Sequence, residues 1–219
     1  IFSLYVRNIN NMFLILDFTK ILTLAIVHSN NILRKDLKTN RNTSDILLDQ
    51  ISKFFIAINK DIKSVKKIYI VTGPGSFTGI RAALTFSKVL SLTIKLEIIG
   101  ISKFEILNFY ADKLDKNKIN LIILHFKKKQ FFVQSFKNGY SIDPPKLVDL
   151  DDHKFKNAGN VNYICDSKEI LTYIKKDDMK EIKGKVKFIK YNLNKLPEII
   201  NNNMIGNKNP RPLYISNYF

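Results

Sequence analysis

The sequence predicts an α/β fold built from two related lobes. Apolar runs of strand length alternate with segments of helical periodicity between residues 12 and 114. A series of hairpin strands then begins again at Ile119. At 219 residues, with 45% hydrophobic content, the chain is large enough to bury a sizeable core. We expect an N-terminal lobe over residues 12–105, a smaller C-terminal lobe over residues 106–219, and a cleft between them.

The first lobe is predicted to open with an antiparallel meander. Residues 1–11 precede the first methionine, Met12, and are expected to be an N-terminal extension. Three apolar runs follow, and Ser29-Asn30-Asn31 suits a hairpin turn because Asn tolerates positive φ. Asp17 places a carboxylate at the first turn. The strands are expected at 12–16, 21–27 and 32–38.

A helix is predicted over residues 44–59, because apolar residues recur at i, i+1, i+4, i+7, i+8 and i+11. This stripe suits packing on a sheet, although Phe54 and Phe55 would equally serve a partner helix. Its members are Leu47, Leu48, Ile51, Phe54, Phe55 and Ile58. The lobe continues with strands at 68–71 and 94–99 and with helices over 77–92 and 103 to about 114.

The stretch around which the chain is organised is the turn Gly73-Pro74-Gly75-Ser76-Phe77-Thr78-Gly79. Three glycines within seven residues predict a positive φ or a close backbone approach. Ser76 or Thr78 is expected to cap the following helix. A phosphate contact is the alternative, because helix N-termini bind anions. The spacing fits neither the P-loop nor the dinucleotide fingerprint, however, and this favours a structural turn.

The second lobe is predicted from a weaker pattern. Lys127-Lys128-Lys129 is expected to form a basic turn, and Asn138-Gly139 a hairpin turn. The charged segment 175–187 reads as a surface loop, and residues 210–215 as extended chain because of their prolines. The predicted strands are 120–126, 130–136, 147–150 and 161–165, and the predicted helices are 167–174 and 196–203.

Composition narrows the class of protein. The net charge is +17, and all but five of the 36 basic residues are lysines. A nucleic-acid surface and a compositional habit of the source both account for this, and the scarcity of arginine favours the second. The single cysteine, Cys165, excludes an internal disulfide and is expected in the core. Without an apolar run long enough for a membrane span, or a signal peptide, we expect a cytoplasmic protein.

Several segments together resemble the bacterial TsaB proteins, most strongly over residues 12–105. They are MFLILDFT, RNTSDILLDQI, GPGSFTGIRAALTFSKVL and RPLYISN. The resemblance implies the actin/Hsp70/sugar-kinase fold, with two ribonuclease-H-like lobes. It also implies a part in making N-threonylcarbamoyladenosine beside the anticodon of tRNAs that read ANN codons.

The resemblance further implies a non-catalytic subunit. TsaB pairs with its paralogue TsaD, which transfers the threonylcarbamoyl group, and the ATPase TsaE joins them. ATP or ADP and metal are therefore expected on the partner subunits, with no cofactor held tightly by this chain. Homodimers are expected when the partner is absent, and tRNA is reached through the complex. The contact is expected on the two N-lobe helices, at Leu47, Ile51, Phe54, Ile80, Arg81, Leu84 and Lys88.

The residues themselves also favour a non-catalytic chain. ATP-using members of this fold carry an Asp-x-Gly turn in each lobe, whereas here the first turn is Asp17-Phe18-Thr19 and the second His125-Phe126-Lys127. The histidine that is usual in TsaB proteins before the first helix is replaced here by Asn42. The three histidines of the chain are expected to be structural rather than metal ligands. The competing hypothesis is a nucleotide-dependent kinase or peptidase-like hydrolase, with Asp17 anchoring a metal and Ser76 or Thr78 contacting phosphate. A third is a lysine-rich tRNA-binding module.

Overall fold

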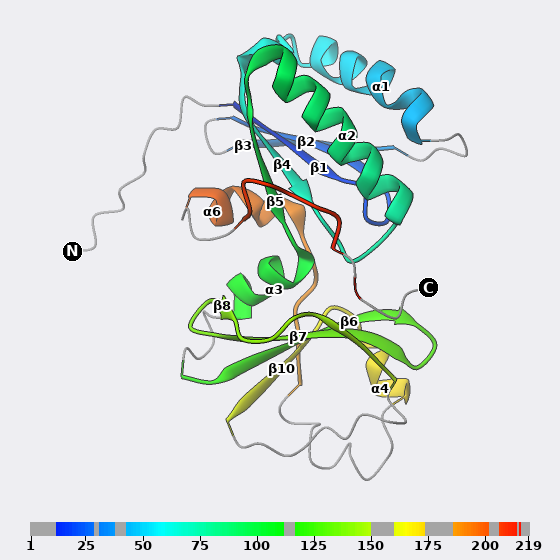
Figure 1. The fold of residues 1–219 in the computed structure, drawn as a ribbon, viewed down its shortest axis with the longest axis vertical. Helices are drawn as coiled ribbons and strands as arrows, with labels where there is room; N and C mark the ends of the chain where they lie inside the picture. The colour runs from blue at the N-terminus through cyan, green and yellow to red at the C-terminus, as the bar shows by residue number, and fades with distance from the viewer. Residues whose placement is uncertain are drawn as a thin grey trace, which may run out of the picture. The chain divides into compact units, whose positions relative to one another are not determined.

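The computed structural model describes residues 12–28, 31–37, 43–111, 117–149, 160–173, 186–201, 206–213 and 215 (Figure 1). The expectations for residues 1–11, Ser29, Asn30, Asn42, His153 and the charged segment up to residue 185 lie outside these ranges. The chain divides into two compact units. The first comprises the described residues up to Ser102 together with 200–201 and 206–213, and the second those from Lys103 to Ile199 together with Ile215.

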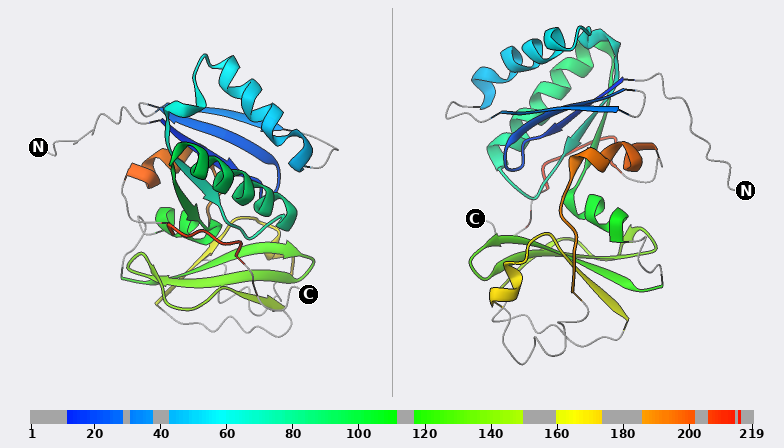
Figure 2. Two further views of the ribbon diagram at one scale, coloured as in Figure 1. Left: turned by 45° about the horizontal axis from the view of Figure 1, so that its top comes forward. Right: turned by 180° about the vertical axis from the view of Figure 1, so that it is seen from behind.

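The first unit is a mixed sheet with two helices on one face (Figures 1 and 2). Its described strands lie in the order β3-β2-β1-β4-β5, with β1, β2 and β3 antiparallel and with β4 and β5 parallel to β1. Parallel strands need crossover connections, and α1 and α2 supply them. The elements are β1 (Met12–Asp17), β2 (Leu22–His28), β3 (Asn31–Leu37), α1 (Thr43–Ala57), η1 (Ile62–Ser64), β4 (Val65–Val71), α2 (Phe77–Ile94) and β5 (Glu97–Ile101).

The core of the first unit lies between the sheet and the two helices. Every residue of β1 is buried, as expected for a central strand that is covered on both faces. Alternate residues of β1 point into the helix-covered face and meet the apolar stripes of α1 and α2. This core includes Leu14, Leu16, Leu24, Ile26, Leu47, Ile51, Phe54, Phe55, Ile68, Ile70, Ile80, Ala83 and Leu84.

The C-terminal segment 206–213 returns to the first unit, whereas the sequence assigned it to the second lobe. Gly100 and Asn207 form a β-bridge, with backbone N–H to O distances of 2.9 and 2.8 Å. The Leu213 N–H donates to the Thr72 carbonyl at 3.0 Å, next to the glycine turn. Two ion pairs add to these hydrogen bonds, because Glu97 pairs with Lys67 at 2.7 Å and with Lys208 at 2.9 Å. We call these three side chains the Glu97 clamp.

The second unit is a second mixed sheet, with the described strands in the order β11-β10-β6-β7-β8 and with β9 paired to β7. β6 is antiparallel to β7 and parallel to β10, which is parallel to β11. The elements are α3 (Lys103–Ala111), β6 (Ile119–Lys127), β7 (Gln130–Lys137), β8 (Tyr140–Ser141), β9 (Lys146–Asp149), β10 (Val161–Cys165), α4 (Ile170–Tyr173), β11 (Val186–Phe188), η2 (Leu193–Lys195) and α6 (Leu196–Asn201).

Helix α3 is joined to the second sheet by a chain of buried amides. The Asn120 side chain donates to Asn108 on α3 at 3.0 Å, and Asn162 on β10 donates to Asn120 at 3.0 Å. Cys165 lies in the core of this unit, as predicted, and its burial raises the pKa of the thiol. The predicted Asn138-Gly139 hairpin is also confirmed, with φ of 52° and 85° at the two turn residues.

Several element boundaries differ from the sequence prediction, among them the following three. The strand predicted at 94–99 begins only at Glu97, because α2 continues to Ile94 and ends at Lys95 in the left-handed conformation. The predicted loop at 175–187 ends in strand β11, whose pairing with β10 outweighs the polarity of Lys187. The helix predicted at 167–174 starts at Ile170.

The Glu97 clamp leads to a prediction about stability. Hydrogen bonds from Lys67 and Lys208 hold the pKa of Glu97 below its usual value of 4.5. When folding lowers the pKa of a carboxyl group, the group stabilises the folded state at pH values above its pKa in the unfolded chain. This stabilisation is lost as the pH falls through its pKa in the folded state. We expect Glu97→Gln to lower the free energy of unfolding at neutral pH by about 0.2–1 kcal/mol, because the pair is partly exposed. In urea denaturation the difference from wild type should shrink as the pH is lowered below about 4.5. A difference that stays constant on acidification would exclude this origin.

Candidate functional site

The glycine turn joins β4 to α2 and packs against the first turn of the chain. Ser76 caps α2, and its hydroxyl accepts a hydrogen bond from the Gly79 N–H at 3.2 Å. This confirms the cap predicted from the sequence and selects Ser76 over Thr78. Gly73 has a φ of +120°, which favours glycine. Gly73, Pro74 and Gly79 are buried, whereas Ser76, Phe77 and Thr78 are exposed.

The other two glycines allow a close backbone approach. A Cβ atom at Gly75 would overlap the carbonyl oxygen of Thr19, and one at Gly79 would overlap that of Phe18. The Ser76 N–H also donates to the Thr19 carbonyl at 2.7 Å. The glycine turn is therefore seated directly on the Asp17-Phe18-Thr19 turn, which is the close approach that the sequence predicted.

Asp17 serves this local structure. It is buried, and its Oδ1 accepts hydrogen bonds from the Thr19 N–H at 3.0 Å and from the Thr19 hydroxyl at 2.6 Å. The carboxylate thus closes its own turn, and Phe18, also buried, stands where a phosphate-binding turn needs glycine. Within the part of the chain described here, no group of three or more His, Cys, Asp and Glu side chains is placed to hold a metal ion.

Five of the seven predicted partner-interface residues lie in the core instead. They are buried between the sheet and the helices, and of the five only Leu47 and Ile51 line a hollow on the outer side of the helices. The physical reason is that the apolar stripe of each helix packs against the sheet of its own unit. The five are Leu47, Ile51, Phe54, Ile80 and Leu84. Arg81 and Lys88 are exposed, as an interface requires.

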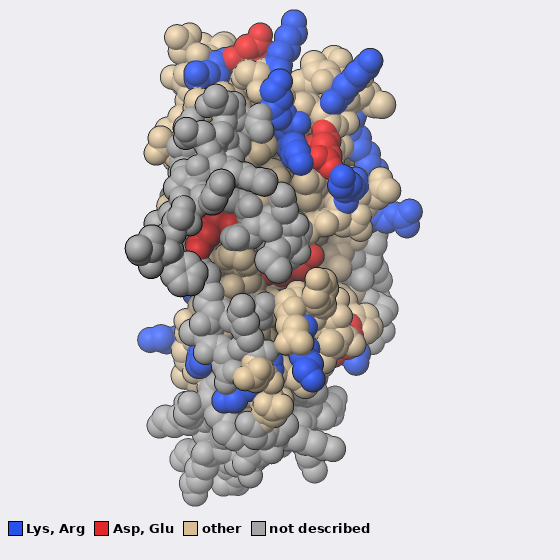
Figure 3. All heavy atoms as spheres, turned by 90° about the vertical axis from the view of Figure 1, so that its left-hand side faces the viewer, with Lys and Arg blue, Asp and Glu red and all other residues tan. Residues whose placement is uncertain are grey.

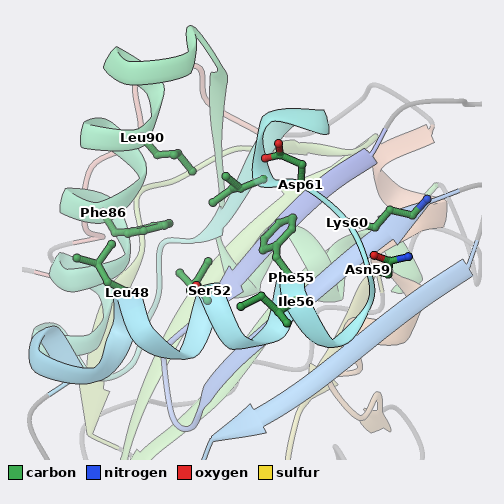
Figure 4. A pocket seen from close by; sticks show the side chains of 11 residues that line it. Leu48, Ser52, Phe55, Ile56, Asn59, Lys60, Asp61, Phe86 and Leu90 are labelled. Atoms are coloured by element: carbon green, nitrogen blue, oxygen red, sulfur yellow. The ribbon is translucent and has the colours of Figure 1, made fainter.

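The exposed faces of α1 and α2 carry a different set of apolar residues. Leu48 and Ile56 on α1 are 70% and 74% exposed, and Val89 and Leu92 on α2 are 60% and 85% exposed. Two adjoining hollows, of about 680 and 470 Å³, run along the two helices and share Leu48 and Phe86. We call the residues of these hollows, with Leu92, the α1–α2 strip. Figure 4 shows Leu48 from α1 and Phe86 and Leu90 from α2 extending into the space between the helices.

The sequence missed this strip because it grouped Leu48 with the buried stripe. An available signal was the position of Leu48, Val89 and Leu92, which lie off the helical positions that meet the sheet. The charge of the strip is positive along α2, which contains Arg81 and Lys88 and no acidic residue. The Arg81 guanidinium lies 5.2 Å from the centre of the exposed Phe77 ring.

The second unit holds a separate cluster around His125, at the end of β6. Its Nδ1 lies 2.7 Å from a Glu169 carboxylate oxygen, and its ring stacks on Tyr173 with centroids 6.1 Å apart. The His125 backbone N–H donates to Asp166 at 3.2 Å. Burial raises the pKa of Asp166, while this hydrogen bond and the charge of Lys103 act in the opposite direction. These contacts hold the His125 side chain near the carboxyl end of β6, consistent with the structural role predicted for it.

The sequence profile of the family described as TsaD: tRNA N6-adenosine threonylcarbamoyltransferase matches residues 22–138, which is more than half of the chain. The chain belongs to this family. The resemblance to the TsaB proteins, predicted from the sequence, is confirmed. Two solved structures share the fold, and the predicted α/β class of two lobes of the actin/Hsp70/sugar-kinase type is confirmed.

The curated relatives carry the TsaB name. Two proteins named "tRNA threonylcarbamoyladenosine biosynthesis protein TsaB", both from Buchnera aphidicola, are 27% identical over 95 residues and 33% identical over 86 residues. The matches span 43% and 39% of this chain and 43% and 41% of those relatives, so less than half of either protein is aligned.

The two structural relatives come from Pseudomonas aeruginosa. One is an uncharacterized protein with similarity to peptidase YEAZ, at a TM-score of 0.65 and 13% identity, covering 94% of this chain and 99% of its own. The other is YeaZ, at a TM-score of 0.55 and 14% identity, covering 76% and 81%. At these identities the likeness concerns the fold. No helix in the described ranges is both long and apolar enough to span a membrane.

The contact between the two turns predicts a strong effect of one methyl group. Gly79→Ala places a Cβ against the Phe18 backbone, which cannot move without displacing buried residues. We expect a loss of about 1–3 kcal/mol in the free energy of unfolding, measured by chemical denaturation. Thr78→Ala, at the exposed neighbouring position, is the matched control and should change stability by less than about 0.5 kcal/mol. Equal stability of Gly79→Ala and wild type would contradict the close contact.

Proposed function

We propose that this chain is a non-catalytic subunit in threonylcarbamoylation of the adenosine beside the tRNA anticodon. In this proposal it docks the TsaD transferase through the α1–α2 strip and holds TsaD in its active form, with TsaE joining the pair. The observation that carries the proposal is the strip itself, an exposed apolar surface over two hollows. It lies on a unit that already has a buried core between its sheet and its helices. Large exposed apolar surfaces of this kind mark protein-binding sites.

The chemistry of the strip supports a particular kind of partner. Leu48, Phe86 and Leu90 provide an apolar centre, while Arg81 and Lys88 lie on the exposed face of α2. A complementary surface therefore has apolar side chains to fill the hollows and acidic side chains opposite α2. In this proposal the paralogue TsaD, which shares the fold, presents such a surface on its own pair of helices. A second copy of this chain does so less well, since its α2 also lacks acidic residues.

The state of the Asp17 turn supports a non-catalytic role. The Asp17 carboxylate accepts two hydrogen bonds from Thr19, and the glycine turn covers the Thr19 backbone. A metal anchor or a phosphate turn needs a free carboxylate and an accessible backbone. ATP, ADP and metal ions are accordingly assigned to the partner subunits in this proposal.

The docking proposal is tested on the exposed residues of the strip. We expect the double variant Leu48→Asp/Val89→Asp to reduce capture of TsaD by at least tenfold in co-purification, because it places two charges in a desolvated contact. Leu33→Asp is the matched control, since Leu33 is 50% exposed on β3 of the same unit and lies outside the strip. The control should capture TsaD normally.

Two results would count against the docking surface: normal capture by the double variant, or an equal loss in the Leu33→Asp control. Ile80→Asp and Leu84→Asp are unsuitable tests, because they place a charge in the core and unfold the unit. Melting curves of each purified variant establish that it is folded before capture is measured.

The alternative of a kinase or peptidase-like hydrolase makes a different prediction. Calorimetry of the isolated chain with ATP and Mg²⁺ should show no tight binding, because Asp17 is engaged by Thr19. Binding at micromolar concentration that is lost in Asp17→Asn and retained in Glu97→Gln would favour the enzyme over the docking subunit. Peptide hydrolysis, assayed on the same preparation, separates the two enzyme classes.

A further inference from the structure

The second unit contains a basic hollow that the docking proposal does not use. It measures about 570 Å³ and is lined by the turn between β6 and β7 together with one residue from β9 and one from α4. The lining residues are Lys127, Lys128, Lys129, Gln130, Asp149 and Tyr173. Lys and Arg side chains also stand at several places on the face drawn in Figure 3, so positive charge does not by itself define a site.

The position of the hollow in the fold suits a ligand. β6 and β10 are parallel, so their carboxyl ends meet at one edge of the sheet. His125 and the lysine turn follow from β6, and α4 with Tyr173 follows from β10. In open α/β sheets, ligands bind outside the carboxyl ends of parallel strands.

The side chains define the chemistry that the hollow recognises. Lys127, Lys128 and Lys129 are exposed and offer three ammonium groups. Lysines act as point charges toward phosphate and carry no base specificity. Tyr173 adds an aromatic ring, held by its stacking on His125, and His125 is held in turn by Glu169. Asp149 is the only acidic lining residue among those described, so the hollow remains net positive.

We propose that this hollow binds a phosphorylated nucleoside of an RNA strand, with the lysines on the phosphates and one base on Tyr173. Aromatic stacking beside a basic groove is the common way in which proteins bind single-stranded nucleic acid without sequence preference. The inference deepens the proposed function and rests on it, since that function makes tRNA the substrate of the complex. It gives this chain a direct contact with the RNA, on the unit that does not dock TsaD.

The test uses the full chain and fluorescently labelled tRNA in an anisotropy titration from about 50 to 300 mM salt. We expect the double variant Lys127→Glu/Lys128→Glu to weaken binding about tenfold or more and to flatten the salt slope by about 1–2. Lys63→Glu/Lys66→Glu is the matched control, because both lysines are exposed on the first unit. The control should keep the wild-type slope.

Tyr173 is tested by a separate readout. Tyr173→Leu should lower the affinity about 5-fold or more while leaving the salt slope unchanged, because a stacked base contributes no phosphate contact. Tyr173→Phe should bind like wild type. If the glutamate double variant fails to fold, Lys127→Gln/Lys128→Gln removes the same two ammonium groups without adding carboxylates, and it should also flatten the slope.

Three results would overturn the proposal: no tRNA binding at the lowest salt, an equal loss of slope in the control, or an unchanged slope in the lysine variant. Displacement of the tRNA by AMP at micromolar concentration would also overturn it, by assigning the hollow to a free nucleotide. The docking proposal is tested by a different measurement, the capture of TsaD by variants of the α1–α2 strip. A failure of RNA binding and a failure of TsaD docking are therefore told apart.

Discussion

The first unit depends on the backbone contact between two turns that lie about sixty residues apart in sequence. Thr19 receives a hydrogen bond from the Ser76 N–H, and Gly75 and Gly79 leave room for the Phe18-Thr19 backbone to come against them. Backbone groups buried in such a contact need hydrogen-bond partners, and the Thr19 carbonyl finds one in the Ser76 N–H. The contact fixes the start of α2, because Ser76 is both its cap and the donor to Thr19. The contact therefore sets the direction of α2, and the position of the α1–α2 strip depends on that direction.

The same contact supports the non-catalytic role in our proposal. In a phosphate-binding turn the backbone must be open to the ligand, whereas the turn at Asp17 is closed by Thr19 and covered by the glycine turn. A glycine-rich turn before a helix is therefore used for packing between parts of the protein. The C-terminal segment strengthens this arrangement from the other side, since Leu213 donates to Thr72 and Gly100 bridges to Asn207. In our proposal the folded unit serves as a rigid base for a docking surface.

The helices illustrate how far residue patterns lead. Their apolar stripes were recognised, and residues such as Ile51 and Leu84 were expected to meet a partner. A stripe buries itself on the nearest apolar surface, and in this unit that surface is the sheet. What is left for a partner is the flank of each helix, at Leu48, Val89 and Leu92. Which flank stays exposed depends on the rotation of each helix on the sheet, a property that emerges only when all the elements pack.

By itself, the sequence determined the α/β class, most strands and helices to within a few residues, a cap at Ser76 or Thr78 and the close approach of the glycine turn. Each follows from local rules, such as periodicity, capping and the missing side chain of glycine. Tertiary structure alone decided the partner of the glycine turn, the pairing of β11, the return of residues 206–213 to the first unit and the meeting of the lysine turn with Tyr173. These depend on contacts between residues distant in sequence, whose free energies no local pattern encodes.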